Sequence, residues 1–315
     1  MDIHFLAEAH AAAVWADISG DGVVKSTANP FCRTRPINAT VRISPRPDSE
    51  LQPRAHGHVH LSVKRDGPRT AIDTLRQAGS SKLLFPRRTG PEIEAVLLNT
   101  AGGVTGGDRF AVDIEAQSGT AMTLTTQAAE RAYAAQPGET GVIRSSLLLG
   151  EDVAFNWLPQ ETILFAGCAL DRSLAVEMAA SSRLLVSEIL VFGRGAMGET
   201  LTCGTFLDRI EVRRGGEKLF LDAIALHGNI AAHLERAAIA AGSGAMVSVV
   251  YVAPDAEAYL GPLRAMLPET AGVSLIGADL LFLRALAQDS FALRQMLIPI
   301  LVRLTKTPLP RCWMI

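Results

Sequence analysis

Turn-forming residues divide most of this chain into short apolar segments, and this spacing limits the fold more than any other feature of the sequence. From His58 to Val252, glycine, proline, asparagine or aspartate separates most of these segments, which recur about every 8–12 residues. Within residues 110–115, Phe110, Val112 and Ile114 alternate with small or charged residues, as in a strand with one buried face. Helical crossovers of the kind that a parallel α/β sheet needs are missing from most of this stretch, so the pattern predicts a mainly β body. Strands are expected at residues 58–63, 93–98, 110–115, 121–126, 142–149, 153–157, 162–165, 174–178, 184–192, 200–213, 218–224 and 247–252.

The last third of the chain has a helical pattern. Residues 229–241 are rich in alanine, and residues 255–267 open with an aspartate that suits a helix N-cap. Residues 278–286 and 290–304 carry leucine and phenylalanine at helical spacing, and Pro299 is expected to kink or break the last helix. The fold class predicted is therefore a long β body with a smaller C-terminal helical part.

The first 54 residues differ from the rest. Residues 44–49 and 52–54 are polar and turn-forming and follow neither the strand nor the helix period. We therefore expect residues 1–54 to form a poorly ordered N-terminal extension. The length of 315 residues alone allows one large domain or two ordinary ones.

Charge and hydropathy exclude several kinds of partner. The net charge of −2 provides no electrostatic reason to expect nucleic acid or an anionic membrane surface. The longest apolar run, residues 296–302, contains Pro299 and is far short of the roughly 18 residues that a membrane span needs. Asp2 and Glu8 stand where a signal peptide requires positive charge, so we expect a cytoplasmic protein.

A glycine pattern at Gly193–Gly198 fits the GxGxxG fingerprint of dinucleotide-binding proteins. That mechanism needs a helix directly after the glycines, whose N-terminus holds the pyrophosphate. Residues 199–205 are instead β-branched and interrupted by Gly204, which favours a glycine-rich turn between two strands. A nucleotide-binding enzyme that uses Gly193–Gly198 remains an alternative function.

A second glycine-rich segment, residues 99–109, is the most unusual part of the sequence. It has the GxxxxG spacing of a P-loop, but Asp108 and Arg109 replace the lysine and hydroxyl residue that bind phosphate and magnesium. Either the backbone here adopts positive φ or approaches another backbone closely, or a rigid loop aims Asp108 and Arg109 at a partner or a cavity. The glycines of this structural loop are Gly102, Gly103, Gly106 and Gly107.

Three histidines at alternate positions, His56, His58 and His60, would face the same side of a strand. Imidazoles in such an arrangement can bind nickel, copper or zinc. A solvent-facing edge of the first strand explains the same pattern. A metal-binding storage protein that uses this triplet is a further alternative function.

Three glutamates are notable for their positions. Glu188 interrupts the apolar run 184–190, while Glu130 and Glu161 follow predicted strands. A buried carboxylate requires a partner or a polar cavity, whereas an exposed strand face would explain each of them without a site. Glu188 fits an exposed face least well.

Several motifs together resemble a known family, the urease accessory protein UreD, called UreH in some bacteria. The resemblance extends from Gly57 to Trp313 and rests on five motifs in matching order and spacing. These motifs are Asn99–Gly103 with Gly106–Asp108, Thr125–Tyr133, Trp157–Glu161, Gly193–Arg194 with Met197–Glu199, and Pro310–Trp313.

The resemblance implies an irregular β-helix-like stack of short strands with helices toward the C-terminus, in a single domain over residues 55–315. It also implies a non-enzyme that binds the helical protein UreF and the GTPase UreG, docks them on apo-urease, and assists nickel insertion into the dinickel centre. A dimer within a hetero-oligomer is expected. No cofactor is expected to bind tightly, and nickel is expected to bind transiently.

A passage lined by carboxylates would allow nickel to enter and leave, because many weak oxygen ligands hold an ion only briefly. Several histidines or cysteines would trap the ion instead. The candidates for lining such a passage are Glu130, Glu161, Glu188, Glu199 and Asp108.

Overall fold

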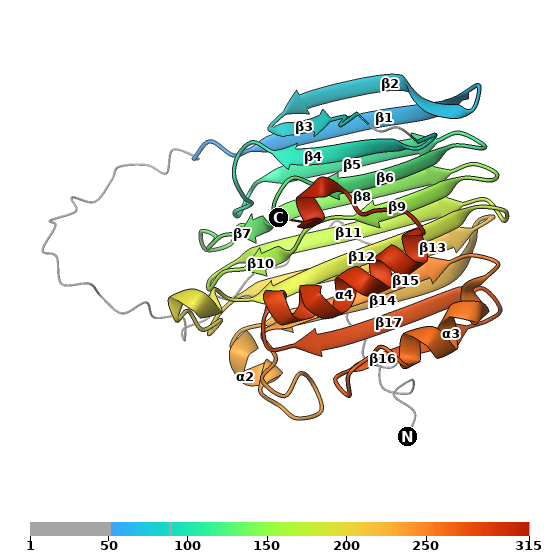
Figure 1. The fold of residues 1–315 in the computed structure, drawn as a ribbon. Helices are drawn as coiled ribbons and strands as arrows, with labels where there is room; N and C mark the ends of the chain where they lie inside the picture. Colours follow the sequence, from blue (N-terminus) through green and yellow to red (C-terminus); the bar gives the residue numbers. More distant parts are fainter. Residues whose placement is uncertain (1–51, 88–89, 315) are drawn as a thin grey trace, which may run out of the picture.

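The computed structural model describes residues 52–87 and 90–314 and contains two stacked β-sheets (Figure 1). The expected N-terminal extension lies outside the described residues, apart from residues 52–54. The first sheet has the order β14 (Glu217–His227), β13 (Thr205–Arg214), β11 (Ala169–Met178), β8 (Gly141–Leu149), β5 (Arg109–Ala116), β1 (His56–Asp66) and β2 (Arg69–Gly79). The second has the order β16 (Ala271–Ile276), β17 (Leu280–Ala287), β15 (Ala245–Val252), β12 (Arg183–Phe192), β9 (Ala154–Leu158), β6 (Ala121–Thr126), β4 (Ile93–Asn99) and β3 (Ser81–Leu84), with β10 (Thr162–Leu164) and β7 (Glu130–Ala132) attached beside β12.

From β4 to β13 the chain coils, because its longer strands alternate between the two sheets while neighbours within each sheet run parallel. Each crossover is therefore a strand of the opposite sheet, which replaces the helix of a βαβ unit. Antiparallel strands complete both ends of the coil, β2 and β3 at one end and β14 to β17 at the other. The structure thus confirms a β-solenoid-like stack with a smaller helical part.

Inward-facing side chains of equivalent strands form rows along the interior. One row is entirely aliphatic and joins five strands of the first sheet in parallel register, and every member is buried. Because a one-residue slip would turn each of these side chains toward solvent, the rows fix the register of the coil. The members of this row are Leu61, Ile114, Leu147, Val176 and Val212.

The two edges of the coil differ in the length of their connections. At one edge only a few residues join β5 to β6, β8 to β9 and β11 to β12. At the opposite edge, residues 100–108, 127–140, 159–168 and 193–204 make long connections that contain β7, β10 and a short 3₁₀ helix, η2 (Gly195–Met197). We call this the long-loop edge; it lies at the left in Figure 1. Loops held by a rigid scaffold often carry functional residues, so we expect the functional site at the long-loop edge.

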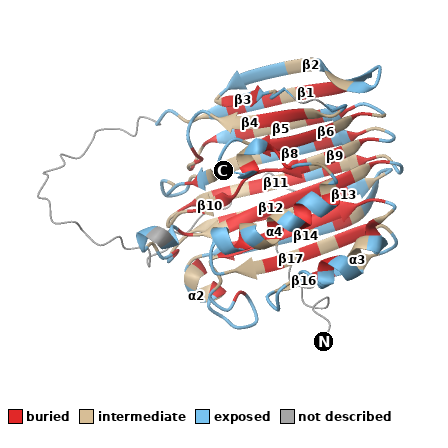
Figure 2. Cartoon of the chain, viewed as in Figure 1, coloured by how far each residue is buried: buried red, intermediate tan, exposed pale blue. Residues whose placement is uncertain are grey.

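Helix α4 (Ser290–Thr305) lies across the outer face of the second sheet (Figures 1 and 2). The side chain of Asp289 caps its first turn by accepting a hydrogen bond from the backbone N–H of Ala292 at 2.8 Å. The helix buries five aliphatic residues together with the outward faces of β15 and β17. These residues are Leu293, Leu297, Ile300, Leu301 and Leu304.

Three expectations about the C-terminal third were wrong. Most of residues 278–286 belongs to strand β17 (Leu280–Ala287), because both faces of this segment are covered and its continuous apolar run fits a buried strand as well as a helix. The alanine-rich segment 229–241 forms only the short helix α2 (Ile230–Leu234). The break that was expected as one outcome at Pro299 is absent, because helix α4 continues past this residue and packing of its apolar face outweighs the lost hydrogen bond. The helix expected at 255–267 is present as α3 (Ala256–Arg264).

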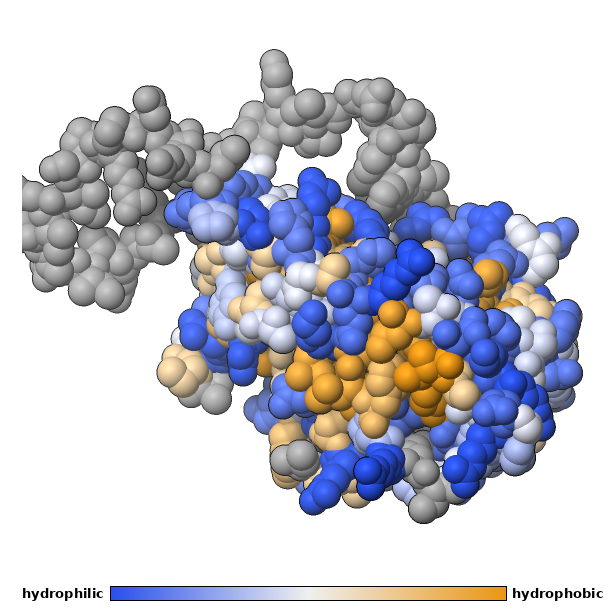
Figure 3. All heavy atoms as spheres, turned by 90° about the horizontal axis from the view of Figure 1, so that it is seen from above, coloured by the Kyte–Doolittle hydropathy of each residue, from blue (hydrophilic) through white to orange (hydrophobic). Residues whose placement is uncertain are grey.

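The end of the coil at β2 and β3 exposes apolar side chains. Figure 3 views the molecule from this end and shows an apolar patch surrounded by polar residues. Ile72 and Leu84 are exposed on these two edge strands, and Leu75 and Phe85 are partly buried against the core. A contiguous apolar patch with a polar rim is typical of a protein-binding surface.

Among the helices of residues 52–87 and 90–314, none is long and apolar enough to cross a membrane.

The C-terminal 3₁₀ helix η3 (Arg311–Met314) attaches to the second sheet through Trp313. The indole is 1% exposed, and its N–H donates to the carbonyl of Leu158 at 3.1 Å and to the hydroxyl of Thr125 at 3.2 Å. The guanidinium of Arg294 lies over the same ring and donates to the Trp313 carbonyl at 2.8 Å. One side chain therefore joins η3, α4 and two strands.

Replacement of Trp313 by alanine should lower the free energy of unfolding by about 3–5 kcal/mol, because it leaves a cavity and two unsatisfied polar groups. Urea denaturation followed by circular dichroism measures the change. Met314 is 69% exposed, so the control Met314→Ala should stay within about 0.5 kcal/mol of the original protein. Equal losses for the two variants would contradict the anchoring role.

Candidate functional site

A cavity of about 180 Å³ lies between the two sheets and reaches the long-loop edge. Its lining includes the exposed residues Gln127 and Ala128, so it communicates with solvent there. Deeper inside, the lining becomes charged. The polar residues that line it include Asn99, Glu130, Ser145, Gln160, Thr162, Arg172, Glu188 and Asp208.

Arg172 of β11 is the centre of the charged part. Its Nη1 donates to Glu188 Oε2 of the opposite sheet at 2.6 Å and to Thr162 Oγ1 at 3.0 Å. Its Nη2 and Nε donate to the two carboxylate oxygens of Asp208 at 2.6 Å and 3.0 Å, in a bidentate pair. The indole N–H of Trp157 donates to the remaining oxygen of Glu188 at 2.7 Å. The cluster thus connects both sheets through fully buried hydrogen bonds.

The charges of this cluster are unequal, since one guanidinium faces two carboxylates. Burial raises the pKa of Glu188, Arg172 opposes this rise, and the nearby charge of Asp208 adds to it. Burial lowers the pKa of Arg172, but the attraction of Asp208 and Glu188 outweighs it and the pKa is raised. Arg172 therefore stays charged, and the removal of one partner from such a buried pair costs about 3–5 kcal/mol.

A second polar group continues this layer through the interior. Glu188 is in register with Ser248 of β15, which is in register with Arg284 of β17. Arg284 donates to Ser248 Oγ at 3.1 Å and to the carboxylate of Asp222 on β14. Burial raises the pKa of Asp222, and Asp208 contributes to the same rise. Two arginines and three carboxylates therefore form a polar layer between two separate apolar clusters of the core.

Glu130 of β7 lies toward the cavity's entrance. Its Oε2 accepts a hydrogen bond from Asn99 Nδ2 at 3.1 Å, and its Oε1 accepts one from the backbone N–H of Arg131 at 3.1 Å. Burial raises the pKa of Glu130; the bonds from Asn99 and Arg131 oppose the rise, and the charge of Asp108 adds to it. Asn99 also donates to the carbonyl of Gly103 at 2.9 Å, which connects this carboxylate to the glycine loop.

The glycine loop is explained by its backbone. A Cβ on Gly103 would lie 2.2 Å from the ring of Tyr133 and 2.7 Å from the Arg131 carbonyl, and Gly102 has a φ of +79°. Asp108 is directed at the loop and not at the cavity, since its two oxygens accept the backbone N–H groups of Ala55 at 2.8 Å and Thr105 at 2.9 Å. Asp108 therefore holds the loop that positions Asn99 and Glu130.

Of the five predicted lining residues, the structure brings Glu130 and Glu188 to one cavity. Glu161 lies outside the lining and pairs with Arg294 of α4 at 2.9 Å. Glu199 pairs with Arg194 at 3.0 Å, and the hydrogen bond from Arg194 lowers the pKa of Glu199. Glu161 thus attaches α4 to the long-loop edge, and Glu199 closes a turn within that edge.

Arg172 and Asp208 were not predicted as site residues, although the strand period singles them out. Both occupy inward positions of alternating strands, Arg172 between Leu170 and Leu174 and Asp208 between Phe206 and Ile210. The two are also directly opposite one another in the parallel register of β11 and β13. A charged residue at an inward position is rare unless it is paired, so these two positions were informative.

The histidine triplet faces outward from β1, as its period implies. His58 Nε2 lies 2.8 Å from Asp113 Oδ2 on the outer face of the first sheet. Throughout residues 52–87 and 90–314, no group of three or more histidine, cysteine, aspartate or glutamate side chains is arranged to hold a metal ion.

The GxGxxG segment forms a turn between β12 and β13. Its helical part is η2, which has only three residues, and the next regular element is a strand. Arg194 folds back on Glu199 through its backbone N–H at 3.1 Å and its side chain at 3.0 Å. The segment therefore lacks the long helix whose N-terminus binds pyrophosphate.

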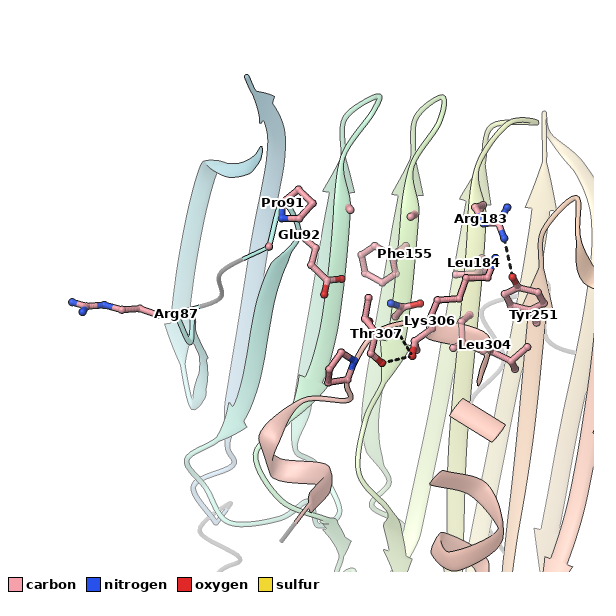
Figure 4. A pocket seen from close by; sticks show the side chains of 17 residues that line it. Arg87, Pro91, Glu92, Phe155, Arg183, Leu184, Tyr251, Leu304, Lys306 and Thr307 are labelled. Atoms are coloured by element: carbon pink, nitrogen blue, oxygen red, sulfur yellow. Dashed lines mark hydrogen bonds between the residues drawn. The ribbon is translucent and has the colours of Figure 1, made fainter. Parts of the chain in front are cut away.

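A larger hollow of about 650 Å³ lies on the outer face of the second sheet, beside the end of α4 (Figure 4). Arg183 donates to Tyr251 Oη at 2.9 Å and to Asp255 at 2.5 Å, and Lys306 lies 2.8 Å from the same carboxylate. Burial raises the pKa of Tyr251 to about 12, so its phenol stays neutral. One carboxylate holds both cations, so the arrangement fastens the end of α4 to the sheet.

The fold and the cavity define a β-solenoid-like protein with a charged interior that opens at one edge. Comparison with known families identifies its class. Residues 55–314 match the family model of the UreD urease accessory protein. The chain is 55% identical over 257 residues to the urease accessory protein UreD of Ruegeria pomeroyi, which covers 82% of this chain and 100% of that protein.

Two further relatives have the same name. The proteins of Roseobacter denitrificans and Sinorhizobium medicae are 47% and 44% identical over 262 and 266 residues. These alignments cover 83% and 82% of this chain and 96% of each relative. The chain therefore belongs to the UreD family of urease accessory proteins.

The raised pKa of Glu130 predicts a pH-dependent effect on stability. Because the folded protein holds this proton more tightly than the unfolded chain, stability falls as pH rises from about 4.5 toward the raised pKa. Glu130→Gln removes this dependence. The free energy of unfolding of the variant minus that of the original protein should therefore be larger at neutral pH than near pH 4.5. Urea unfolding at the two pH values measures the difference.

Glu199→Gln is the control of opposite sign, because the pKa of Glu199 is lowered. Its original carboxylate contributes stability above about pH 4.5 that is lost as pH falls. Glu199→Gln should therefore be less stable than the original protein at neutral pH. A common pH dependence for Glu130→Gln and the original protein would contradict the effect of burial on Glu130.

Proposed function

We propose that this chain is a maturation scaffold for urease, which docks a UreF–UreG GTPase complex on apo-urease and passes nickel toward the dinickel site. The observation that carries the proposal is the internal cavity lined by Glu130, Glu188 and Asp208. Membership of the UreD family supports the role in maturation. The partners and the nickel route are parts of the proposal.

The chemistry of the cavity suits a mobile divalent ion. Its charged ligands are carboxylates, which bind Ni²⁺ more weakly than clusters of thiolates or imidazoles. Gln160 lines the cavity and is 5% exposed, yet its Nε2 has no hydrogen-bond partner within the described structure. A buried amide of this kind is satisfied by water, and the volume is sufficient for several waters. A hydrated ion would therefore find both solvent and charge inside.

The surface around the entrance suits a protein partner. Met197 and Tyr133 are exposed at the long-loop edge, and Tyr133 stacks edge-on against Phe165 with ring centroids 5.0 Å apart. Exposed methionine and tyrosine are enriched at protein interfaces. We assign this edge to the partner that delivers nickel.

The remaining features of the proposal follow the family resemblance. The chain acts without catalysing a reaction and without a tightly bound cofactor, and nickel is its transient cargo. It works in the cytoplasm as part of a dimer within a hetero-oligomer. The absence of a long helix after Gly193–Gly198 removes the structural basis of the nucleotide-binding alternative.

The double variant Glu130→Gln/Asp208→Asn should reduce urease activation roughly tenfold or more, because it removes two of the carboxylates that line the cavity. Co-expression with urease subunits and accessory proteins, followed by urease activity and nickel per urease, measures the effect. Co-purification of the complex checks that assembly is retained.

Asp113→Asn is the matched control, since Asp113 lies on the outer face of the first sheet, opposite the cavity. This variant should activate urease normally. Full activation by the double variant would refute the passage, and full activation without the chain would refute the maturation role itself.

A further inference from the structure

The oxygen atoms around the Arg172 guanidinium form a set that also suits a divalent cation. Thr162 Oγ1, Glu188 Oε2 and both oxygens of Asp208 lie 2.6–3.0 Å from its nitrogens. Two carboxylates and a hydroxyl are hard oxygen donors of the type that divalent ions bind. The guanidinium therefore occupies the position at which an ion inside the cavity would find its strongest ligands.

The charge balance of the cluster favours a divalent ion over the guanidinium. Arg172 supplies one positive charge against the two carboxylates Glu188 and Asp208, so one negative charge is left uncompensated. An ion of charge +2 in the same position would neutralise both.

Water and ions can approach the cluster from the cavity. Arg172, Glu188 and Asp208 all belong to the lining that reaches the long-loop edge. Gln160, whose buried Nε2 has no hydrogen-bond partner within the described structure, belongs to the same lining. One cavity lining therefore includes both the exposed residues at the edge and the guanidinium.

Arg172 cannot leave its carboxylates by losing a proton, because a guanidinium stays protonated in proteins. It can leave only by rotation of its side chain. Because the guanidinium remains covalently attached beside the two carboxylates, it returns whenever they become free.

We propose that Arg172 is a tethered counter-ion that competes with Ni²⁺ for Glu188 and Asp208 and so prevents the ion from being trapped inside the protein. This inference rests on the proposed function. Entering Ni²⁺ takes the two carboxylates from the guanidinium, and the returning guanidinium releases the ion. No covalent bond changes in the exchange.

Arg172→Met tests the proposal, since it removes the competing charge and keeps most of the side-chain volume. Equilibrium dialysis of the purified full chain with NiCl₂ should show roughly tenfold tighter binding or more in this variant than in the original protein. The additional change Asp208→Asn should abolish the gain. A purely structural ion pair would produce no gain in nickel affinity.

Arg194→Met is the matched control, because Arg194 forms an arginine–glutamate pair with Glu199 outside the cavity. It should leave nickel affinity unchanged. Unchanged affinity in Arg172→Met, or a gain that survives Asp208→Asn, would overturn the proposal.

Thermal unfolding with and without NiCl₂ covers the case in which Arg172→Met destabilises the chain. Nickel should stabilise this variant more than it stabilises the original protein, because only in the original protein does a guanidinium compete with the ion for the two carboxylates. Arg172→Lys retains the positive charge and should bind nickel with an affinity between the two. Arg172→Met could remain unfolded even when nickel is present. In that case, a nickel affinity of Arg172→Lys equal to that of the original protein would overturn the proposal.

Urease activation separates this inference from the proposed function. If Arg172 competes with nickel for its carboxylates, Arg172→Met binds nickel tightly and activates urease less than the original chain in the co-expression assay. If the original chain is required for activation but Arg172→Met gains no affinity, the counter-ion role fails and the maturation role stands. If the chain is not required, the proposed function fails whatever the dialysis shows.

Discussion

The contact between Arg172 and Glu188 is the interaction on which the interior depends. It crosses from one sheet to the other, and the bidentate pair with Asp208 fixes the guanidinium while Trp157 fixes the glutamate. An apolar interior would hold two sheets together without such a bridge, and replacement of a buried ion pair by apolar residues is often neutral or stabilising. The protein instead maintains a charged layer between two apolar clusters, which makes function the better explanation of the layer.

The two edges of the coil have different structural roles. The short connections at one edge keep the strands in register, so that the rows of aliphatic side chains superimpose. The long connections at the other edge carry Glu130, the glycine loop and the segment around Arg194. Corresponding strands β5, β8, β11 and β13 begin at residues 109, 141, 169 and 205, so the coils differ in length because these loops differ. The loop lengths can therefore vary without moving the charged layer.

The β body could be predicted from sequence because a strand's alternation and its bounding turns are local properties. The coil could not, since parallel neighbours such as β5 and β8 are brought together only by packing through the opposite sheet. That part of the fold came from family resemblance. Residues 278–286 were mistaken for a helix because an apolar run covered on both sides lacks a clear period.

Half of the site was visible for a related reason. Glu188 stood out within an apolar run, and Glu130 lay in a motif, whereas Arg172 and Asp208 looked like ordinary charges on amphipathic strands. Glu161, Glu199 and Asp108 are equally notable in sequence, but each is used by a nearby partner. Whether a carboxylate faces a cavity or an arginine depends on distant strands, which no local pattern records.

The position of Trp313 has a consequence for the order in which parts of the chain fold during synthesis. Coils from β4 to β12 contact mainly their neighbours and can assemble in the order in which the ribosome delivers them. The indole instead binds Thr125 and Leu158, residues made more than 150 positions earlier. Until residue 313 emerges, the outer faces of β6 and β9 lack their cover. A nascent chain must therefore keep this surface from associating with other proteins until Trp313 has been made and has docked.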